Sequence, residues 1–158
     1  AWDERGRAWV VEARDYPHGL VAEGEPGRDS IKICEDTDGD GKADKFTVFA
    51  DQLNLATSMV FVNGGILVSE ARHMLFLKDT DGDGKADVRH AILPGWGVGD
   101  THAQQSNLAR GFDNWLYGAV GYSNFRGNVG GKELPFGQGV FRFKADGSVL
   151  EFLHQFNN

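Results

Sequence analysis

The nine-residue sequence "DTDGDGKAD" at residues 36–44 recurs without a single change at residues 79–87. The two copies start 43 residues apart, and the segments around them are also similar. Repetition at a fixed period of this length is typical of proteins built from consecutive copies of one supersecondary unit. The fold of the chain therefore follows from what surrounds each copy.

Strand-like segments flank both copies. "SIKICE" (30–35) and "HMLFLK" (73–78) precede them, and "KFTVFA" (45–50) and "VRHAIL" (88–93) follow them. Short runs rich in β-branched and aromatic residues, bounded by turn residues, predict strands. Each acidic copy is thus expected to be the loop of a β-hairpin.

A turn followed by a further strand-like segment stands earlier in each unit, in "RGRAWVVE" (5–12), "NGGILVSE" (63–70) and "FDNWLYGA" (112–119). The third unit closes with "GVFRFKADGSVLEFL" (139–153), in which Asp146-Gly147 predicts a tight hairpin turn instead of an acidic loop. No segment combines helical periodicity with helix caps. The sequence predicts an all-β chain of three units.

A unit of about 40 to 50 residues with four strands is typical of one blade of a β-propeller. We expect one partial propeller domain over residues 1–158, with blades at about 1–53, 54–98 and 99–158. Since propellers close with about four to eight blades, three blades predict a fragment of a larger ring, of about six or seven blades.

Strands are expected at 57–62, 65–70, 73–78 and 88–93 in the second blade and at 104–110, 114–119, 138–144 and 148–154 in the third. The first blade starts at its second strand, so its first strand is expected before residue 1.

The acidic loops carry aspartates at positions 1, 3, 5 and 9, and glycines at positions 4 and 6 permit a tight turn. Converging carboxylates repel one another unless a cation lies between them, and hard carboxylate oxygens suit Ca²⁺. The backbone carbonyl of the lysine at position 7 is a further expected ligand. The predicted ligands of two calcium ions are Asp36, Asp38, Asp40, Lys42 and Asp44 in the first loop and Asp79, Asp81, Asp83, Lys85 and Asp87 in the second.

The loops differ from an EF-hand, which has a bidentate Glu at position 12 and helices on both sides. Position 12 is Thr47 in one copy and His90 in the other, so we expect the aspartate at position 9 to replace the Glu. The alternative is an Asp/Gly turn that binds no ion.

The net charge of −7 and the absence of a basic stripe argue against nucleic-acid binding. The single cysteine, Cys34, excludes an internal disulfide and a CxxCH haem attachment within this chain. The sequence contains no run of eighteen apolar residues, so no transmembrane segment is predicted. The N-terminal residues do not have the pattern of a signal peptide, so a signal peptide is absent or lies upstream. Because weak calcium sites suit compartments with high free calcium, we expect a periplasmic or extracellular location.

Long polar connections predict where chemistry would occur. In a propeller the acidic hairpin loops lie on one face, while residues 13–29, 94–105 and 120–137 are irregular loops expected on the other. Function usually resides on such loops, so the metal ions are expected to be structural. The polar residues expected on the loop face are Arg14, Asp15, Tyr16, His18, Glu70, Arg72, His102, Gln104, Gln105, Tyr122, Asn124 and Arg126.

His102 is the candidate general base, because imidazole titrates near neutral pH. The alternative is a histidine that lines the central channel and only bonds a loop. Arg14 and Arg72 are candidates for binding anionic groups, with loop anchoring as the alternative.

The segments "GRAWVVEARDYP", "IKICEDTDGDGKADKFTVFADQL", "LFLKDTDGDGKADV" and "GFDNWLYGAVG", in this order, resemble the propeller domain of proteins from planctomycetes and verrucomicrobia that are named membrane-bound dehydrogenases. These are relatives of the PQQ-dependent glucose/sorbosone dehydrogenases. The resemblance covers nearly the whole chain. It implies a larger exported parent protein, membrane-associated in some cases, often with a cytochrome-type haem domain as a partner.

The resemblance also implies a reaction. Soluble PQQ sugar dehydrogenases carry a catalytic histidine just before a segment similar to "GFDNWLYGAVG", and by that match His102 takes the proton of a sugar hydroxyl while hydride passes to the quinone. Arg14, Arg72 and Gln104 are then candidate contacts of PQQ or of the sugar or alcohol substrate. The residues that hold PQQ in that family belong largely to other blades.

The first hypothesis is therefore the calcium-stabilised propeller portion of a PQQ-type sugar or alcohol dehydrogenase-like protein. The alternative is a non-catalytic propeller that binds glycans or proteins. A lactonase-like hydrolase would need a metal in the central channel, whereas the carboxylates here lie on hairpin loops.

Overall fold

The computed structural model describes residues 1–17 and 19–156, and these residues form thirteen strands and no helix. The strands are β1 (Ala8–Glu12), β2 (Asp29–Glu35), β3 (Lys45–Leu53), β4 (Ser58–Val62), β5 (Gly65–Glu70), β6 (His73–Lys78), β7 (Val88–Ile92), β8 (Gln105–Arg110), β9 (Leu116–Val120), β10 (Phe125–Val129), β11 (Lys132–Phe136), β12 (Gly139–Phe143) and β13 (Leu150–His154).

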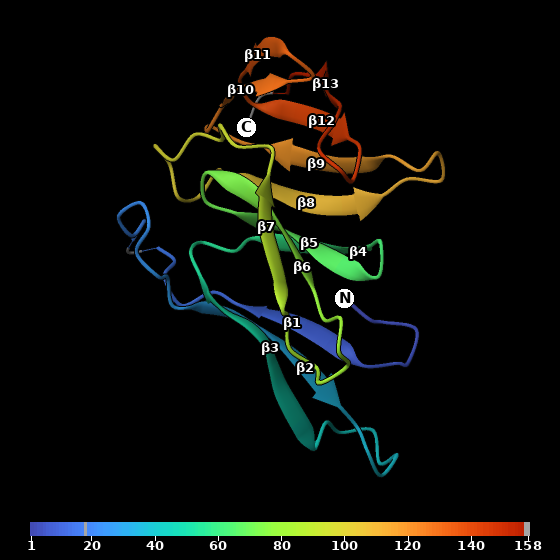
Figure 1. The fold of residues 1–158 in the computed structure, drawn as a ribbon. Helices are drawn as coiled ribbons and strands as arrows, with labels where there is room; N and C mark the ends of the chain where they lie inside the picture. Colours follow the sequence, from blue (N-terminus) through green and yellow to red (C-terminus); the bar gives the residue numbers. More distant parts are fainter. Residues whose placement is uncertain (18, 157–158) are drawn as a thin grey trace.

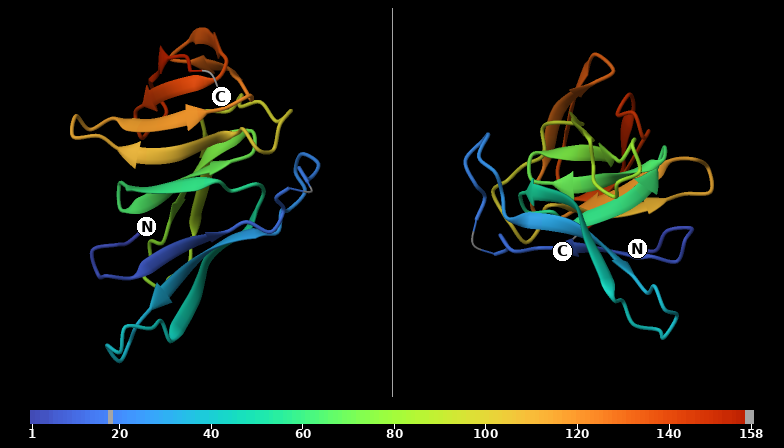
Figure 2. Two further views of the ribbon diagram at one scale, coloured as in Figure 1. Left: turned by 180° about the vertical axis from the view of Figure 1, so that it is seen from behind. Right: turned by 60° about the horizontal axis from the view of Figure 1, so that its bottom comes forward.

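The strands form antiparallel sheets that follow the predicted units. The first sheet has the order β1-β2-β3, the second β4-β5-β6-β7 and the third β8-β9-β12-β13, while β10 and β11 form a separate hairpin. Figure 1 shows the three larger sheets one above another in chain order, and Figure 2 shows the same arrangement from behind. The chain is an all-β, propeller-like stack of sheets.

The second sheet is buried on both faces, because successive side chains of a strand point to opposite sides. Ile66 and Val68 belong to an apolar cluster shared with Trp9 and Ile33 of the first sheet. Leu67, between them, belongs to a cluster shared with the third sheet. The third sheet contributes several residues to the cluster that contains Leu67, among them Leu116, Val120, Phe141, Phe143 and Leu150. Neighbouring sheets are therefore held together by apolar contacts rather than by strand pairing.

The strand predictions for the second and third units are confirmed to within a few residues. The turn at Asp146-Gly147 is also confirmed, with Gly147 at a φ of 72° and its N–H donating to the Lys144 carbonyl over 2.8 Å. The number of blades in a closed ring stays a prediction.

One expectation is wrong. Residues 120–137 were expected to be an irregular loop, but they contain the hairpin β10–β11. Gly130 and Gly131 form its two-residue turn with φ values of 59° and 82°, which suits the twist of paired strands. The first sheet begins with β1, the counterpart of the second strand of the other units, and Trp2 pairs with Ala8 only in an isolated antiparallel bridge, so a first strand before residue 1 stays a prediction.

A search of the described residues for helices long and apolar enough to cross a lipid bilayer found none.

Candidate functional site

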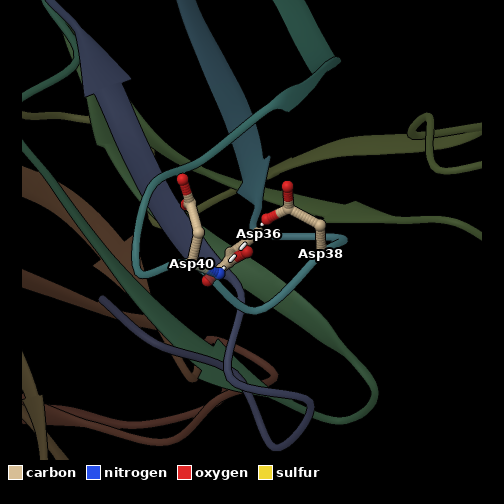
Figure 3. A group of neighbouring side chains, drawn as sticks. All are labelled: Asp36, Asp38 and Asp40. Atoms are coloured by element: carbon tan, nitrogen blue, oxygen red, sulfur yellow. Dashed lines mark hydrogen bonds between the residues drawn. The ribbon is translucent and has the colours of Figure 1, made fainter.

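The two acidic loops bring carboxylates together as predicted. In the first loop, Asp36, Asp38 and Asp40 each offer an oxygen atom, and these oxygen atoms lie within 4.8 Å of one another (Figure 3). In the second loop, Asp79, Asp81 and Asp87 do the same. Three converging carboxylates form a suitable site for a hard divalent cation.

Backbone N–H groups shape both loops in the same way. The first aspartate of each loop accepts two hydrogen bonds: Asp36 from the N–H groups of Gly39 and Gly41 at 2.7 and 2.8 Å, and Asp79 from those of Gly82 and Gly84 at 2.6 and 2.8 Å. All four glycines have φ between 80° and 86°, a region that favours glycine. The loop geometry is thus encoded by the glycines at positions 4 and 6.

These hydrogen bonds also favour the charged form of the first aspartate. The N–H of Gly41 is the main influence that holds the pKa of Asp36 below its ordinary value. Burial would raise the pKa of Asp79, but the N–H groups of Gly82 and Gly84 outweigh it and lower that pKa. Both side chains are therefore ionised at neutral pH.

Of the predicted ligands, Asp44 and Lys42 of the first loop and Asp83 and Lys85 of the second lie outside these groups of three. Asp44 and Asp87 accept hydrogen bonds from the threonine at position 2 of their loops, with the Thr37 and Thr80 hydroxyls at 2.9 and 2.6 Å. Asp40 and Asp83 accept from the backbone N–H groups of Lys42 and Lys85, both at 2.8 Å. The Lys42 side chain is exposed, with Nζ 3.9 Å from Asp40. The residues at position 12, Thr47 and His90, lie on β3 and β7.

The two loops differ in their surroundings. In the second loop, the Ala86 N–H donates to the Phe49 carbonyl of β3 over 2.8 Å, so the loop is joined to the first sheet. Arg89, just after this loop, donates to the carbonyls of Asp51 and Gln52 at 2.8 and 3.1 Å. The first loop projects away from the stacked sheets (Figure 2). The second loop therefore contributes to the junction between sheets.

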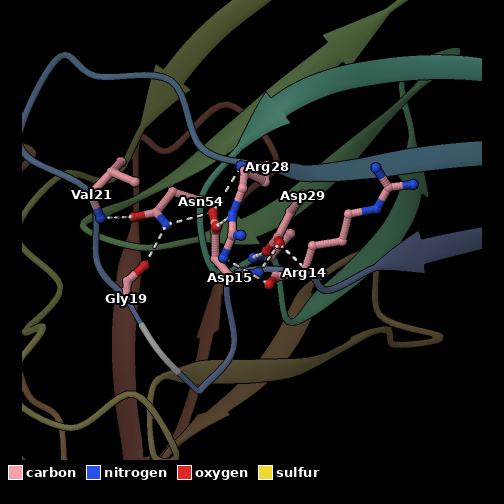
Figure 4. A network of polar contacts seen from close by, with 8 residues as sticks. Arg14, Asp15, Gly19, Val21, Arg28, Asp29 and Asn54 are labelled. Atoms are coloured by element: carbon pink, nitrogen blue, oxygen red, sulfur yellow. Dashed lines mark hydrogen bonds and ion pairs between the residues drawn. The ribbon is translucent and has the colours of Figure 1, made fainter.

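A buried polar network lies at the opposite end of β2 (Figure 4). Asp29 accepts hydrogen bonds from the backbone N–H groups of Arg14 (2.6 Å), Asp15 (2.8 Å) and Ala56 (2.8 Å). Asp15 accepts from Arg28 Nε at 2.7 Å and from Asn54 Nδ2 at 3.0 Å. The network fixes the segment 13–29 against the connection between the first two sheets.

The network favours ionised Asp15. Burial would raise the pKa of this carboxyl group, but the backbone N–H and the guanidinium of Arg28, together with the Asn54 amide, outweigh burial and lower the pKa below its usual value. The sequence did not indicate a role for Asp29, Asn54 or the Arg28 side chain.

His102 lies on the same side of the molecule. Its side chain is 66% exposed, and its Nδ1 lies 3.3 Å from Asp100 Oδ1. The Tyr16 ring packs edge-on against the imidazole with 5.2 Å between ring centroids, so segments 13–29 and 94–105 meet at this histidine. Within the part of the chain that the structure describes, Nε2 forms no hydrogen bond.

Gln104 is 4% exposed, and neither its Oε1 nor its Nε2 has a hydrogen-bond partner among the described residues. Buried amide groups are normally hydrogen-bonded, so the side chain has unused capacity for a ligand. The neighbouring Gln105 instead joins sheets, because its Nε2 donates to the carbonyl of Glu70.

The two predicted arginines do not converge on His102. Arg14 is paired with Glu12 over 2.9 Å, and Arg72 donates to the Val21 carbonyl at 3.4 Å. Arg72 also has a φ of 76° and its carbonyl accepts from Gly95 and Trp96, which makes it an anchor between loops. His18 lies outside the described residues.

Comparison with known proteins gave one match. The sequence matches the family model described as "Domain of unknown function (DUF7133)" over residues 1–158. No curated protein and no solved structure matched. Because the match spans the whole chain, this protein belongs to the DUF7133 family.

Proposed function

We propose that the chain is a calcium-stabilised, propeller-like module that binds one Ca²⁺ in each acidic loop. The observation that carries the proposal is the convergence of Asp36, Asp38 and Asp40, and of Asp79, Asp81 and Asp87, within 4.8 Å. Two unit charges about 4 Å apart repel by roughly 1 kcal/mol in water and several-fold more near a protein surface. A bound divalent cation would turn this repulsion into attraction.

Calorimetric titration of the full chain with Ca²⁺ tests the proposal. We expect about two ions per chain for the wild type and about one for each of Asp38→Ala and Asp81→Ala. Asp51→Ala, which removes an exposed carboxylate outside both loops, is the matched control and should keep two. A wild-type protein that is folded and binds no Ca²⁺ would refute the proposal.

Dehydrogenase activity on a sugar or alcohol is the second candidate function. It is favoured by the exposed imidazole of His102, with Asp100 beside Nδ1, and by the unpartnered amide of Gln104 two residues away. In this proposal His102 would accept the hydroxyl proton of the substrate at Nε2, with Asp100 beside Nδ1 orienting the ring, while the hydride would pass to a redox cofactor held by parts of the parent protein outside this chain.

The quinone PQQ does not fit the residues described. Its carboxylates call for converging cations, whereas Arg14 is paired with Glu12 and Arg72 is bonded to a loop carbonyl. The cationic contacts would have to come from residues outside this chain, consistent with a larger exported parent protein.

Quinone-dependent dye reduction by the full-length parent protein, with sugars and simple alcohols as substrates, tests this second candidate. His102→Ala should abolish turnover, whereas His154→Ala, at an exposed histidine of β13, should leave it unchanged. Equal activity in both variants would exclude His102 as the base. Absence of quinone binding by a folded, calcium-loaded parent would favour a glycan- or protein-binding module instead.

A further inference from the structure

A cavity of about 450 Å³ lies on the face of the acidic loops, away from His102. It is lined by the turn before β1, the β4–β5 turn at Asn63-Gly64, the end of β8 and the second acidic loop. Small-molecule sites in proteins have volumes of about 300 to 1,000 Å³. The cavity is therefore large enough for a ligand.

The floor of the cavity is aromatic. Trp9 packs edge-on against Phe49 at 4.6 Å and against Phe61 at 5.3 Å between ring centroids, and all three side chains line the cavity. Phe61 is half-buried, which leaves part of its surface available to a ligand. An apolar floor of this kind suits a ligand with at least one apolar face.

Three arginines line the rim of the cavity, and they differ in whether an acidic side chain is paired with them. Arg7 is already engaged, because its Nε lies 2.7 Å from Asp3 Oδ2, and Asp3 also accepts from Trp9 Nε1 at 3.0 Å. Arg5 and Arg110 are exposed, and within the part of the chain that the structure describes neither forms an ion pair. Arg110 donates only to the neutral amide of Asn114, at 3.2 Å. Two guanidinium groups are thus free to bind an anion.

Two further acidic side chains, Asp79 and Glu4, line the cavity, and they differ in hydrogen bonding and exposure. Both oxygens of Asp79 accept loop N–H groups, and Asp79 is one of the carboxylates proposed to bind calcium. Glu4 is exposed and opposes the arginines. Occupation of the second loop by Ca²⁺ would remove the negative charge of Asp79 and leave the cavity with a positive balance.

We propose that this cavity binds a small organic carboxylate with an apolar face, of the uronic acid class, and that Ca²⁺ in the second acidic loop strengthens the binding. Arg5 and Arg110 bind the carboxylate, while the ring of the ligand lies against the aromatic floor. The calcium dependence rests on the proposed function of the loops. By linkage, the ligand must strengthen calcium binding by the same factor.

Calorimetric titration of the calcium-loaded full chain with D-glucuronate tests the proposal, with D-glucose as the uncharged comparison. Glucuronate should bind and glucose should bind at least tenfold more weakly. Arg5→Gln and Arg110→Gln should each weaken glucuronate binding about tenfold, and Glu4→Gln should tighten it. Arg126→Gln, at an exposed arginine of β10, is the matched control and should have no effect.

The two acidic loops provide a second comparison. Asp81→Ala should weaken glucuronate binding, because the second loop lines the cavity, whereas Asp38→Ala in the first loop should not. No glucuronate binding by a chain that binds two calcium ions would overturn this inference and leave the proposed function intact. Equal binding with and without calcium would overturn the coupling, and a chain that binds no calcium would refute the proposed function itself.

Discussion

Asp29 is a fully buried carboxylate with no cationic partner among the described residues. Its oxygen atoms accept hydrogen bonds instead from three backbone N–H groups, of Arg14, Asp15 and Ala56. Buried polar groups are tolerated when they have hydrogen-bond partners, which explains how this side chain is accommodated inside. One side chain thus joins the first sheet to two connections.

Asp29→Ala should be strongly destabilising. The substitution leaves three buried N–H groups without an acceptor, and each such group costs about 1 to 3 kcal/mol. We expect a loss of at least about 3 kcal/mol in the free energy of unfolding, measured by urea denaturation. Asp51→Ala, at an exposed position of β3, should change it by less than about 0.5 kcal/mol. Equal effects of the two substitutions would contradict this role of Asp29.

Asp15 predicts a pH dependence. Its pKa is lowered in the folded state, so its contribution to stability is present above the ordinary pKa of about 4 and is lost as the pH falls through the folded value. The melting temperature of the wild type should decrease below about pH 4, and part of that decrease should be missing in Asp15→Asn. Identical pH profiles for the two proteins would argue against this coupling.

The sequence could place Asp15 on the loop face, but not its partners. The Asn54 amide reaches Asp15 across 39 residues of sequence, and Asp29 bonds to backbone groups that every residue carries. Such contacts leave no pattern in a single sequence. The acidic loops, by contrast, could be predicted because their ligands and glycines are local and repeated.

At the scale of elements, the two loops have the same sequence but different neighbours. The second loop is joined to β3 by the bond from Ala86 to Phe49, whereas the first projects from its hairpin. Loss of calcium from the second loop should therefore weaken the contact between the first two sheets. Loss from the first should affect one hairpin only.

Asp81→Ala should consequently lower the melting temperature in calcium more than Asp38→Ala does. Ligand binding at 100 times the dissociation constant stabilises a protein by about 2.7 kcal/mol. Chelation should remove the contributions of both sites from the wild type, and it should remove more from Asp38→Ala, which keeps the second site, than from Asp81→Ala. Equal sensitivity of both variants to chelation would contradict the difference between the loops.

The hairpin β10–β11 shows where element prediction fails. Its many glycines and polar residues indicate a loop, but Phe125 and Phe136 stack at 5.2 Å and pack against Trp96. Tertiary contacts with an aromatic cluster thus select strands in a segment of low strand propensity. The hairpin also holds the connection that carries His102, because the backbone N–H of Arg126 on β10 donates to the Gly95 carbonyl at 2.8 Å.

At the scale of the whole molecule, the second sheet is central to stability because it is covered on both sides. Leu67 faces the third sheet and Leu75 faces the first, and both are at most 3% exposed. The repeat period predicted this stacking, since blades bury both faces against neighbours. The sequence did not predict which residues face which neighbour.

Leu67→Ala and Leu75→Ala should each cost about 2 to 5 kcal/mol of unfolding free energy. Leu153→Ala, at an exposed leucine of β13, should cost less than about 0.5 kcal/mol. If the sheets unfold together, circular dichroism and tryptophan fluorescence will report the same transition in every variant. Separate transitions would show that the sheets are independent.

The hydrogen bond from the Ala86 N–H to the Phe49 carbonyl joins the second acidic loop to the sheet that precedes it in the chain. The second acidic loop reaches backward along the chain, so an ion bound there acts on the unit that precedes it. The loop at 36–44 has the same sequence, so we expect a sheet placed ahead of β1 to meet it as β3 meets the second loop.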